Sequence, residues 1–125
     1  MSYIKYEVEV HSNGSKFWYL NGEYHRLDGP ACEYSDGTKV WYMNGKLHRE
    51  DGPAMEKADG SKYWCKHDQL HNDLGPAVEF ANGQKAWYLN DEKLTEQEFN
   101  NITKIKELTI SDLQSLLGYK IKIIE

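Results

Sequence analysis

The chain has 125 residues, enough for one modest hydrophobic core, and its 20 acidic and 15 basic residues give a formal net charge of −5. This acidic balance argues against DNA, RNA or an anionic membrane as the main partner. No apolar run is long enough to span a membrane, and the first residues lack the apolar core of a signal peptide. We therefore expect a cytoplasmic protein, in which Cys32 and Cys65 are ordinary reduced thiols.

A 23-residue repeat organises most of the chain. Four segments align without a gap, and they start at residues 13, 36, 59 and 82. Tryptophan, lysine, histidine and proline recur with this period. The recurring residues are Trp18, Trp41, Trp64 and Trp87; Lys16, Lys39, Lys62 and Lys85; His25, His48 and His71; and Pro30, Pro53 and Pro76. Such self-similarity indicates stacked supersecondary units, none of which can bury its own apolar face alone.

Each repeat contains two turn signals between short aromatic and β-branched runs. The Asn-Gly and Asp-Gly dipeptides favour two-residue type I′ turns, because both central residues of that turn need a positive φ. The Asp-Gly-Pro sequence that follows interrupts strand pairing, since proline offers no N–H to a neighbour. The unit is therefore predicted as strand, tight turn, strand, tight turn and short strand.

If both turns hold two residues, the strand register follows by counting. In the second repeat, Cys32 then lies opposite Trp41, and Tyr42 lies opposite Leu47. Because side chains alternate between the faces of a strand, one face carries the tryptophans and histidines, and the other carries tyrosine, glutamate and arginine. The tryptophan face is the more apolar and is expected to form the core. Val40, on the tyrosine face, is expected to meet solvent or a ligand.

The last part of the chain follows a different pattern. Thr95 with Glu98, and Ser111 with Gln114, each fit a capping box that starts a helix. Residues 119–124 alternate between polar and apolar side chains like a strand. We expect this segment to close the open end of the repeats or to cover their tryptophan face, as terminal caps of repeat arrays do.

No group of residues predicts a cofactor, a metal site or a catalytic centre. His25, His48 and His71 recur two or three strands apart, roughly 10–14 Å at about 4.8 Å per strand, which is too far to share a metal ion. Each is expected to pack on the tryptophan across the strand. Glu33 and its equivalents favour scaffold ion pairs over acid/base chemistry, because repetition makes their environments alike. The sequence also lacks a Walker loop, an HExxH motif and a GxSxG motif.

The remaining candidate is the predicted tyrosine face. Residues that recur within one chain hold the scaffold, and residues that vary can tune recognition. Tyrosine and arginine are favoured at binding hot spots, because they bury a large area and keep a polar tip. A face that is merely exposed is the alternative. The candidate binding residues are Phe17, Tyr19, Arg26, Val40, Tyr42, Arg49, Tyr63 and Tyr88.

The WYxNGxxHRxDGPA unit resembles the variant branch of the membrane occupation and recognition nexus (MORN) repeat, as found in large tailed bacteriophages and giant viruses. The resemblance implies a mainly β fold, a twisted antiparallel β-repeat sheet with a small C-terminal α-helical cap. Residues 1–94 would form the four-unit array, and residues 95–125 the helical cap ending in a short strand. It also implies an interaction scaffold, because MORN-type repeats serve mainly as binding surfaces.

The repeat and the resemblance together favour a non-enzymatic binding module without a cofactor. The first hypothesis is a viral protein that binds and inhibits a host defence protein in the host cytoplasm. The second is a sponge that sequesters a nucleotide-type immune signalling molecule, and the third is a structural adaptor scaffold. A closed pocket would favour the sponge, whereas a flat or shallow face would favour a protein partner. The oligomeric state stays open.

Overall fold

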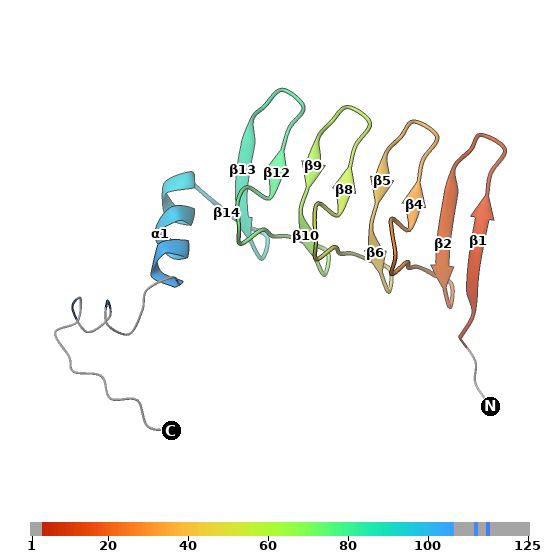
Figure 1. Cartoon of the computed structure of the whole chain (residues 1–125), viewed down its shortest axis with the longest axis horizontal. Coiled ribbons are helices and arrows are strands. Elements are labelled where there is room, and N and C mark those ends of the chain that lie inside the picture. Colours follow the sequence, from red (N-terminus) through yellow and green to blue (C-terminus); the bar gives the residue numbers. More distant parts are fainter. Residues whose placement is uncertain (1–3, 107–111, 113–114, 116–125) are drawn as a thin grey trace, which may run out of the picture. The chain divides into compact units, whose positions relative to one another are not determined.

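The structure, a computed structural model, describes residues 4–106, 112 and 115. It confirms the mainly β fold, with antiparallel sheets that do not close and, among the described residues, one C-terminal helix. The chain divides into two compact units, residues 1–94 and residues 95–125. All of the described strands belong to the first unit, and their hairpins stand side by side in chain order (Figure 1).

A ten-stranded sheet forms most of the first unit. Its strands follow one another in space in the order β1-β2-β4-β5-β8-β9-β12-β13-β14, with β3 paired to β2. Because this order follows the chain, each repeat packs on the one before it, and β1 lies at an edge of the sheet. The strands are β1 (Tyr6–Val10), β2 (Lys16–Leu20), β3 (Glu23–Tyr24), β4 (Cys32–Glu33), β5 (Lys39–Val40), β8 (Met55–Glu56), β9 (Lys62–Tyr63), β12 (Val78–Glu79), β13 (Lys85–Leu89) and β14 (Glu92–Leu94).

Two smaller hairpins lie in the second and third repeats. They are formed by β6 (Tyr42–Met43) with β7 (Lys46–Leu47), and by β10 (Cys65–Lys66) with β11 (Gln69–Leu70). The predicted two-residue turn is confirmed here, with Tyr42 opposite Leu47 and with Asn44 and Gly45 both at positive φ (50° and 77°). The equivalent turns keep this conformation where the dipeptide is His67-Asp68 or Asn90-Asp91. The backbone position, and not glycine alone, therefore defines the turn.

The predicted two-residue turn at Asp36-Gly37 is wrong. The N–H of Tyr34 donates to the carbonyl of Thr38 (2.9 Å), so that three residues, and not two, form the loop. Only Gly37 in this loop has a positive φ (96°). The carboxylate of Asp36 accepts the N–H of Thr38 at 2.8 Å, a side-chain turn that holds the longer loop in place.

The extra loop residue shifts the register of the long sheet by one residue. Cys32 lies opposite Val40 rather than opposite Trp41, and Glu33 lies opposite Lys39. Cys32 and Val40 are 0% and 3% exposed, so the core lies on their side of the sheet. We call this line the inner row; it consists of Phe17, Cys32, Val40, Met55, Tyr63, Val78 and Ala86.

The opposite face of the same strands carries alternating charges. In every neighbouring pair of strands from β2 to β13, a lysine lies opposite a glutamate. We call this line the Lys/Glu row; it consists of Lys16, Glu33, Lys39, Glu56, Lys62, Glu79 and Lys85. Opposite charges at facing positions stabilise a sheet. The lysine column therefore faces carboxylates of the chain itself.

The histidine column ties successive repeats together. The N–H of Asn44 donates to Nδ1 of His25 (3.0 Å), and the N–H of His67 donates to Nδ1 of His48 (3.2 Å). His71 repeats the contact with the next turn at 3.0 Å. Each imidazole thus accepts the first N–H of the following type I′ turn, a donor that a two-residue hairpin leaves free. The column has a structural role that its period alone does not predict.

The second unit contains α1 (Glu96–Lys106). Its predicted capping box is confirmed, since Glu98 N–H donates to Thr95 Oγ1 (3.1 Å) and Thr95 N–H donates to Glu98 Oε1 (2.9 Å). The expected box at Ser111 and Gln114 and the expected strand at 119–124 lie outside the described residues. Within the described part of the chain, no helix has the length and apolar character needed to cross a membrane.

The loops of the long sheet predict a response to acid. Hydrogen bonds from the backbone of Thr38 and Ser61 lower the pKa of Asp36 and Asp59 from the ordinary value of 3.8. A lowered folded-state pKa adds stability that is present above the unfolded value and is lost as the pH falls through the folded value. We therefore expect thermal stability to fall on acidification below about pH 4, as measured by circular dichroism.

A matched variant tests the origin of this loss. Asn13 and Asn82 occupy the same loop position in the first and fourth repeats, and their side-chain oxygens accept the same backbone N–H at 2.9 and 3.0 Å. The double variant Asp36→Asn, Asp59→Asn should therefore fold normally at neutral pH and lose less stability in acid. An unchanged acid response in this variant would assign the loss to other carboxylates.

Candidate functional site

The structure divides the predicted binding residues between the two faces of the sheet. Arg26 and Arg49 were expected beside the tyrosines, but their guanidinium carbons lie 3.8 Å from the ring centres of Trp18 and Trp41. The tryptophans occupy equivalent sites, as predicted, yet they are half-buried rather than core residues. The reason is the one-residue shift in register, which places the core on the inner row.

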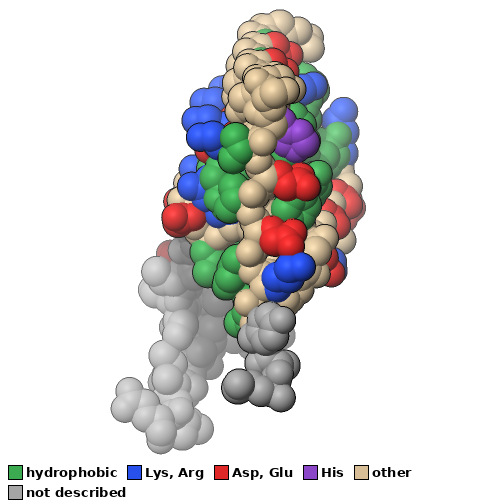
Figure 2. Space-filling model, turned by 90° about the vertical axis from the view of Figure 1, so that its right-hand side faces the viewer, with side chains coloured by type: hydrophobic (Ala, Val, Ile, Leu, Met, Phe, Trp, Pro, Cys, Tyr) green, Lys and Arg blue, Asp and Glu red, His purple; other side chains and the backbone are tan. Residues whose placement is uncertain are grey.

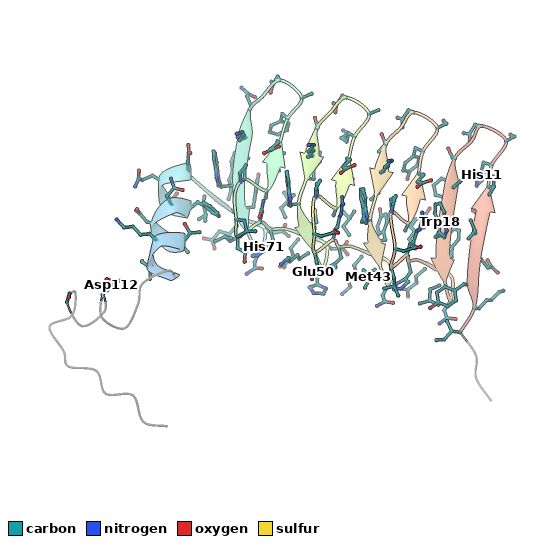
Figure 3. The ribbon with its side chains drawn as sticks, viewed as in Figure 1. His11, Trp18, Met43, Glu50, His71 and Asp112 are labelled. Carbon is teal, nitrogen blue, oxygen red and sulfur yellow. The ribbon has the colours of Figure 1, made fainter. Side chains whose placement is uncertain are left out.

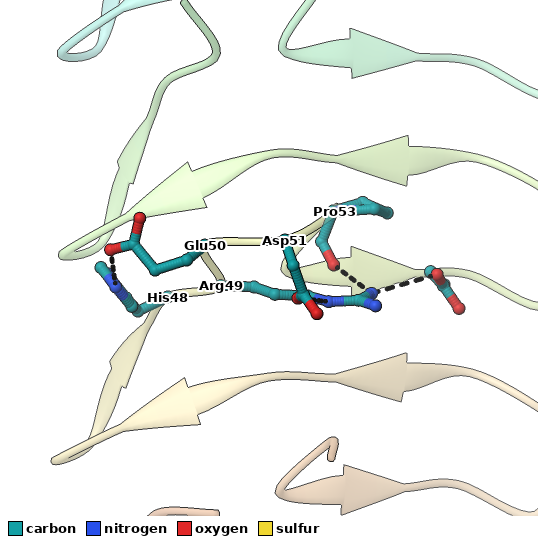
Figure 4. A network of polar contacts seen from close by, with 6 residues as sticks. His48, Arg49, Glu50, Asp51 and Pro53 are labelled. Carbon is teal, nitrogen blue, oxygen red and sulfur yellow. Dashed lines mark hydrogen bonds and ion pairs between the residues drawn. The ribbon is translucent and has the colours of Figure 1, made fainter. Parts of the chain in front are cut away.

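Each arginine is held by its own repeat. The Nε atom of Arg49 donates to Asp51 Oδ1 (2.8 Å), and one terminal nitrogen donates to the Pro53 carbonyl (3.1 Å) and lies 3.3 Å from Glu56 (Figure 4). Arg26 makes the same set of contacts in the first repeat. The guanidinium thereby stacks on tryptophan and fixes the Asp-Gly-Pro loop. These arginines are scaffold residues, and they do not join the tyrosines in one surface.

Val40 is also misplaced by the predicted register. It is 3% exposed and lies between β4 and β8, so no partner can reach it. Tyr63 shares its row and is half-buried, with its ring centre 6.4 Å from that of Phe80. Tyr88 lies half-buried in β13. The expected site is therefore not one continuous surface along four repeats.

Aromatic side chains gather instead at the N-terminal end of the tyrosine face. Tyr24 is the centre of the group, with its ring 5.0 Å from Tyr19, 5.1 Å from Tyr42 and 6.1 Å from Phe17. Phe17 in turn contacts two further rings edge to face. We call this group the aromatic cluster; it consists of His11, Phe17, Tyr19, Tyr24, Tyr34 and Tyr42.

The cluster centres on Tyr24 of the first repeat, a residue that the sequence pattern did not single out. Leu47 and Leu70 replace Tyr24 in the next two repeats. The confirmed type I′ turn already implies the central contact, since it places Tyr24 directly opposite Tyr19. Pairing across that turn was the signal that could have identified Tyr24. His11 lies outside the repeat, so its period could not have revealed it.

Three tyrosines of the cluster, Tyr19, Tyr34 and Tyr42, keep their hydroxyl protons and can donate hydrogen bonds. Burial raises the pKa of Tyr34 to about 12, and burial also raises the pKa of Tyr19 and Tyr42. Tyr19 donates its hydroxyl to Glu9 Oε1 at 2.9 Å, so that an acidic strand borders the cluster. The cluster thus offers a partly exposed surface of packed aromatic rings with O–H donors and an acidic margin, and it contains no arginine.

The tryptophan face holds a series of depressions that are open to solvent. One of them has a volume of about 750 Å³ and is lined by Trp41, Met43 and the loops that carry Arg26 and Arg49. An equivalent depression of about 260 Å³ adjoins Trp64 in the next repeat. Figure 3 shows Trp18, Met43, Glu50 and His71 one after another along the repeat array. These depressions repeat with the scaffold, and carboxylates already pair with their arginines.

Metal binding finds no support in the described residues. Within residues 4–106, 112 and 115, no three histidine, cysteine, aspartate or glutamate side chains lie close enough together to hold an ion. Both Cys32 and Cys65 are free and buried, and burial raises the pKa of each thiol to about 11. Neither thiol therefore has the low pKa that a reactive cysteine requires.

Comparisons of the chain with protein-family models, with curated proteins and with solved structures found no match. The resemblance of the repeat to the MORN variant is therefore an expectation drawn from the repeat itself.

Proposed function

We propose that the chain is a non-enzymatic binding module for a protein partner, and that the aromatic cluster is the centre of its contact surface. The observation that carries the proposal is the packing of three rings, those of Phe17, Tyr19 and Tyr42, around Tyr24 on a half-exposed face. Stacked rings lose little conformational entropy on binding, and their hydroxyl groups supply directional hydrogen bonds. Such surfaces are typical of hot spots between proteins.

The geometry supports a protein partner better than a sequestered nucleotide. A nucleotide-type molecule needs an enclosed pocket and free cationic groups for its phosphates. The depressions on the tryptophan face are open, and their arginines pair with Asp28 and Asp51 at 2.8 Å. The resemblance to viral repeats extends the proposal to a host defence protein that the chain binds and inhibits.

The test uses residues that the chain itself places at equivalent positions. We expect Tyr24→Leu to retain the fold, because Leu47 and Leu70 fill this site in the next two repeats. The partner is first captured from bacterial lysate and identified by mass spectrometry, and its affinity is then measured by titration calorimetry with purified components. Tyr24→Leu should weaken binding at least about tenfold, or about 1.4 kcal/mol, because it removes the central ring.

The matched control is Tyr88→Leu, at the fourth-repeat equivalent of Tyr19 and outside the cluster. It should leave the affinity within about twofold. Thermal melts of both variants separate a loss of contact from a loss of fold. Equal affinities for Tyr24→Leu and the natural chain, with both well folded, would remove the cluster from the contact surface.

A further inference from the structure

The first strand leaves one side of its backbone without a neighbouring strand. β1 stands first in the strand order and pairs only with β2 among the described residues. The backbone groups of Lys5 and His11 bond toward β2 and its turn. Because these groups alternate along an antiparallel strand, Tyr6, Val8 and Val10 point their N–H and C=O groups outward. β1 therefore presents a row of free donors and acceptors.

The side chains of β1 separate sharply by type. The apolar residues at alternate positions are all exposed, and Figure 2 shows hydrophobic side chains on one side of the strand and acidic ones on the other. The exposed fractions are 63% for Ile4, 62% for Tyr6, 53% for Val8 and 68% for Val10. Glu7 and Glu9 lie on the opposite side, beside the aromatic cluster, with half of each side chain exposed.

The only protection that β1 carries against pairing is the charge of Glu7 and Glu9, which lie on the inner-row side of the sheet. Free edges are usually blocked by proline, a bulge, a short strand or an inward-pointing charge. The equivalent strands β4, β8 and β12 are two residues long and follow an Asp-Gly-Pro or Leu-Gly-Pro break. β1 has five residues, no proline and no break. A long edge strand with exposed apolar side chains, whose two glutamates disfavour any added strand that lacks positive charges, indicates a docking strand for a basic segment.

The charges define what can dock there. A strand added to β1 must place its own side chains opposite Glu7 and Glu9 on one face and opposite three apolar residues on the other. The sheet already pairs glutamate with lysine along its whole Lys/Glu row. A second copy of β1 fits poorly, because the register that uses all five residues places Glu7 opposite Glu9 of the other copy.

We propose that β1 binds, by strand addition, an extended protein segment in which lysine or arginine alternates with isoleucine or valine. Backbone hydrogen bonds supply the affinity of such an addition, and alternate side chains supply the specificity. The inference deepens the proposed function by naming the chemistry of the partner, and it rests on that function only in taking the partner to be a protein.

The sequence of the chain supplies a suitable probe. Residues 119–124 read Tyr-Lys-Ile-Lys-Ile-Ile, with the required alternation. A fluorescent peptide of this sequence is titrated against the full chain and followed by anisotropy, beside a control peptide in which both lysines are glutamate. We expect the lysine peptide to bind at least about tenfold more tightly. The chain variant Lys120→Glu, Lys122→Glu is titrated as well, so that the chain's own segment cannot compete.

Two variants of β1 test the mode of binding. Val8→Pro removes an outward N–H that β2 does not use, so it should abolish binding and leave the melting temperature nearly unchanged. Glu7→Lys with Glu9→Lys should reverse the preference between the two peptides. Three results would overturn the proposal. They are equal binding of both peptides, full binding of the lysine peptide by Val8→Pro, and no binding of that peptide to either the natural chain or the Lys120→Glu, Lys122→Glu variant.

Two further measurements separate this inference from its alternatives. Sedimentation of the chain alone should show no dimer formed through β1. A dimer that Val8→Pro converts to monomers would assign the edge to a second copy and overturn the proposal. Tyr24→Leu should bind the lysine peptide as well as the natural chain does. Peptide binding that survives Tyr24→Leu distinguishes the docking strand from the aromatic cluster, and either can fail without the other.

Discussion

Val40→Asp is expected to destabilise the repeat array by about 3–5 kcal/mol, the range found when a buried charge is left without a partner. Val40 is 3% exposed and lies in the inner row, between Cys32 on one strand and Met55 on the next. Neither neighbour can neutralise or hydrogen-bond a carboxylate effectively. Because small domains are stable by only about 5–15 kcal/mol, the loss is a large part of the total. Urea unfolding, followed by tryptophan fluorescence, measures it.

The same substitution at an exposed valine is the control. Val10 is 68% exposed and lies opposite Lys16, so Val10→Asp should change stability by no more than about 0.5 kcal/mol. A normal urea midpoint for Val40→Asp would show that Val40 meets solvent. The two-residue turn at Asp36-Gly37 and the register that follows from it would then be correct after all.

The repeat and its two-residue turns, such as the one at Asn44-Gly45, could be predicted because they depend on local chemistry. A type I′ turn needs two residues that tolerate positive φ, and Asn44-Gly45 satisfies this without help from elsewhere. The three-residue loop at Asp36-Gly37 could not be predicted from the dipeptide alone. Asp36-Gly37 suits a two-residue turn equally well, but the Asp36 carboxylate caps Thr38 and stabilises a three-residue loop. One residue of loop length decided the outcome.

That single residue changed the candidate site more than it changed the fold. Because strand side chains alternate with a period of two, a shift of one residue exchanges the two faces. The inner row became the core and Val40 became buried. The stack of Arg49 on Trp41 has a separate origin, because the Asn44-Gly45 hairpin that joins these two residues keeps its predicted register. The antiparallel repeat architecture was unaffected, since it depends on the period of the turns and not on their length. The sequence therefore predicts the architecture more securely than the composition of either face.

The contacts between successive repeats were the second feature that could not be predicted from the sequence. Periodicity shows that His48 has equivalents, but it does not show that Nδ1 accepts an N–H from a residue 19 positions later. The docking strand is different, because the alternation of apolar and acidic residues at 6–10 is a property of the sequence itself, although the repeat pattern does not include it. Its significance depends on β1 being an edge strand, and only the strand order establishes that.

Gly52→Ala is expected to cost about 1–3 kcal/mol, the usual penalty for an overpacked site. A Cβ atom at this position would lie 2.9 Å from the guanidinium carbon of Arg49. The guanidinium can swing away, but it then gives up its stack on Trp41 and its contacts with Asp51 and the loop carbonyl. The cost is thus the loss of these contacts, and urea unfolding of the variant measures it.

The third repeat contains the matched control. Asn72 replaces the arginine there, and a Cβ at Gly75 would meet nothing closer than the Asn72 amide at 3.9 Å. Gly75→Ala should therefore be neutral or slightly stabilising, by up to about 1 kcal/mol, because alanine restricts the unfolded chain. In an Arg49→Asn background, Gly52→Ala should cost no more than about 0.5 kcal/mol, since that pair reproduces the third repeat. If Gly52→Ala and Gly75→Ala shift stability equally, the stacked arginine is not what requires glycine.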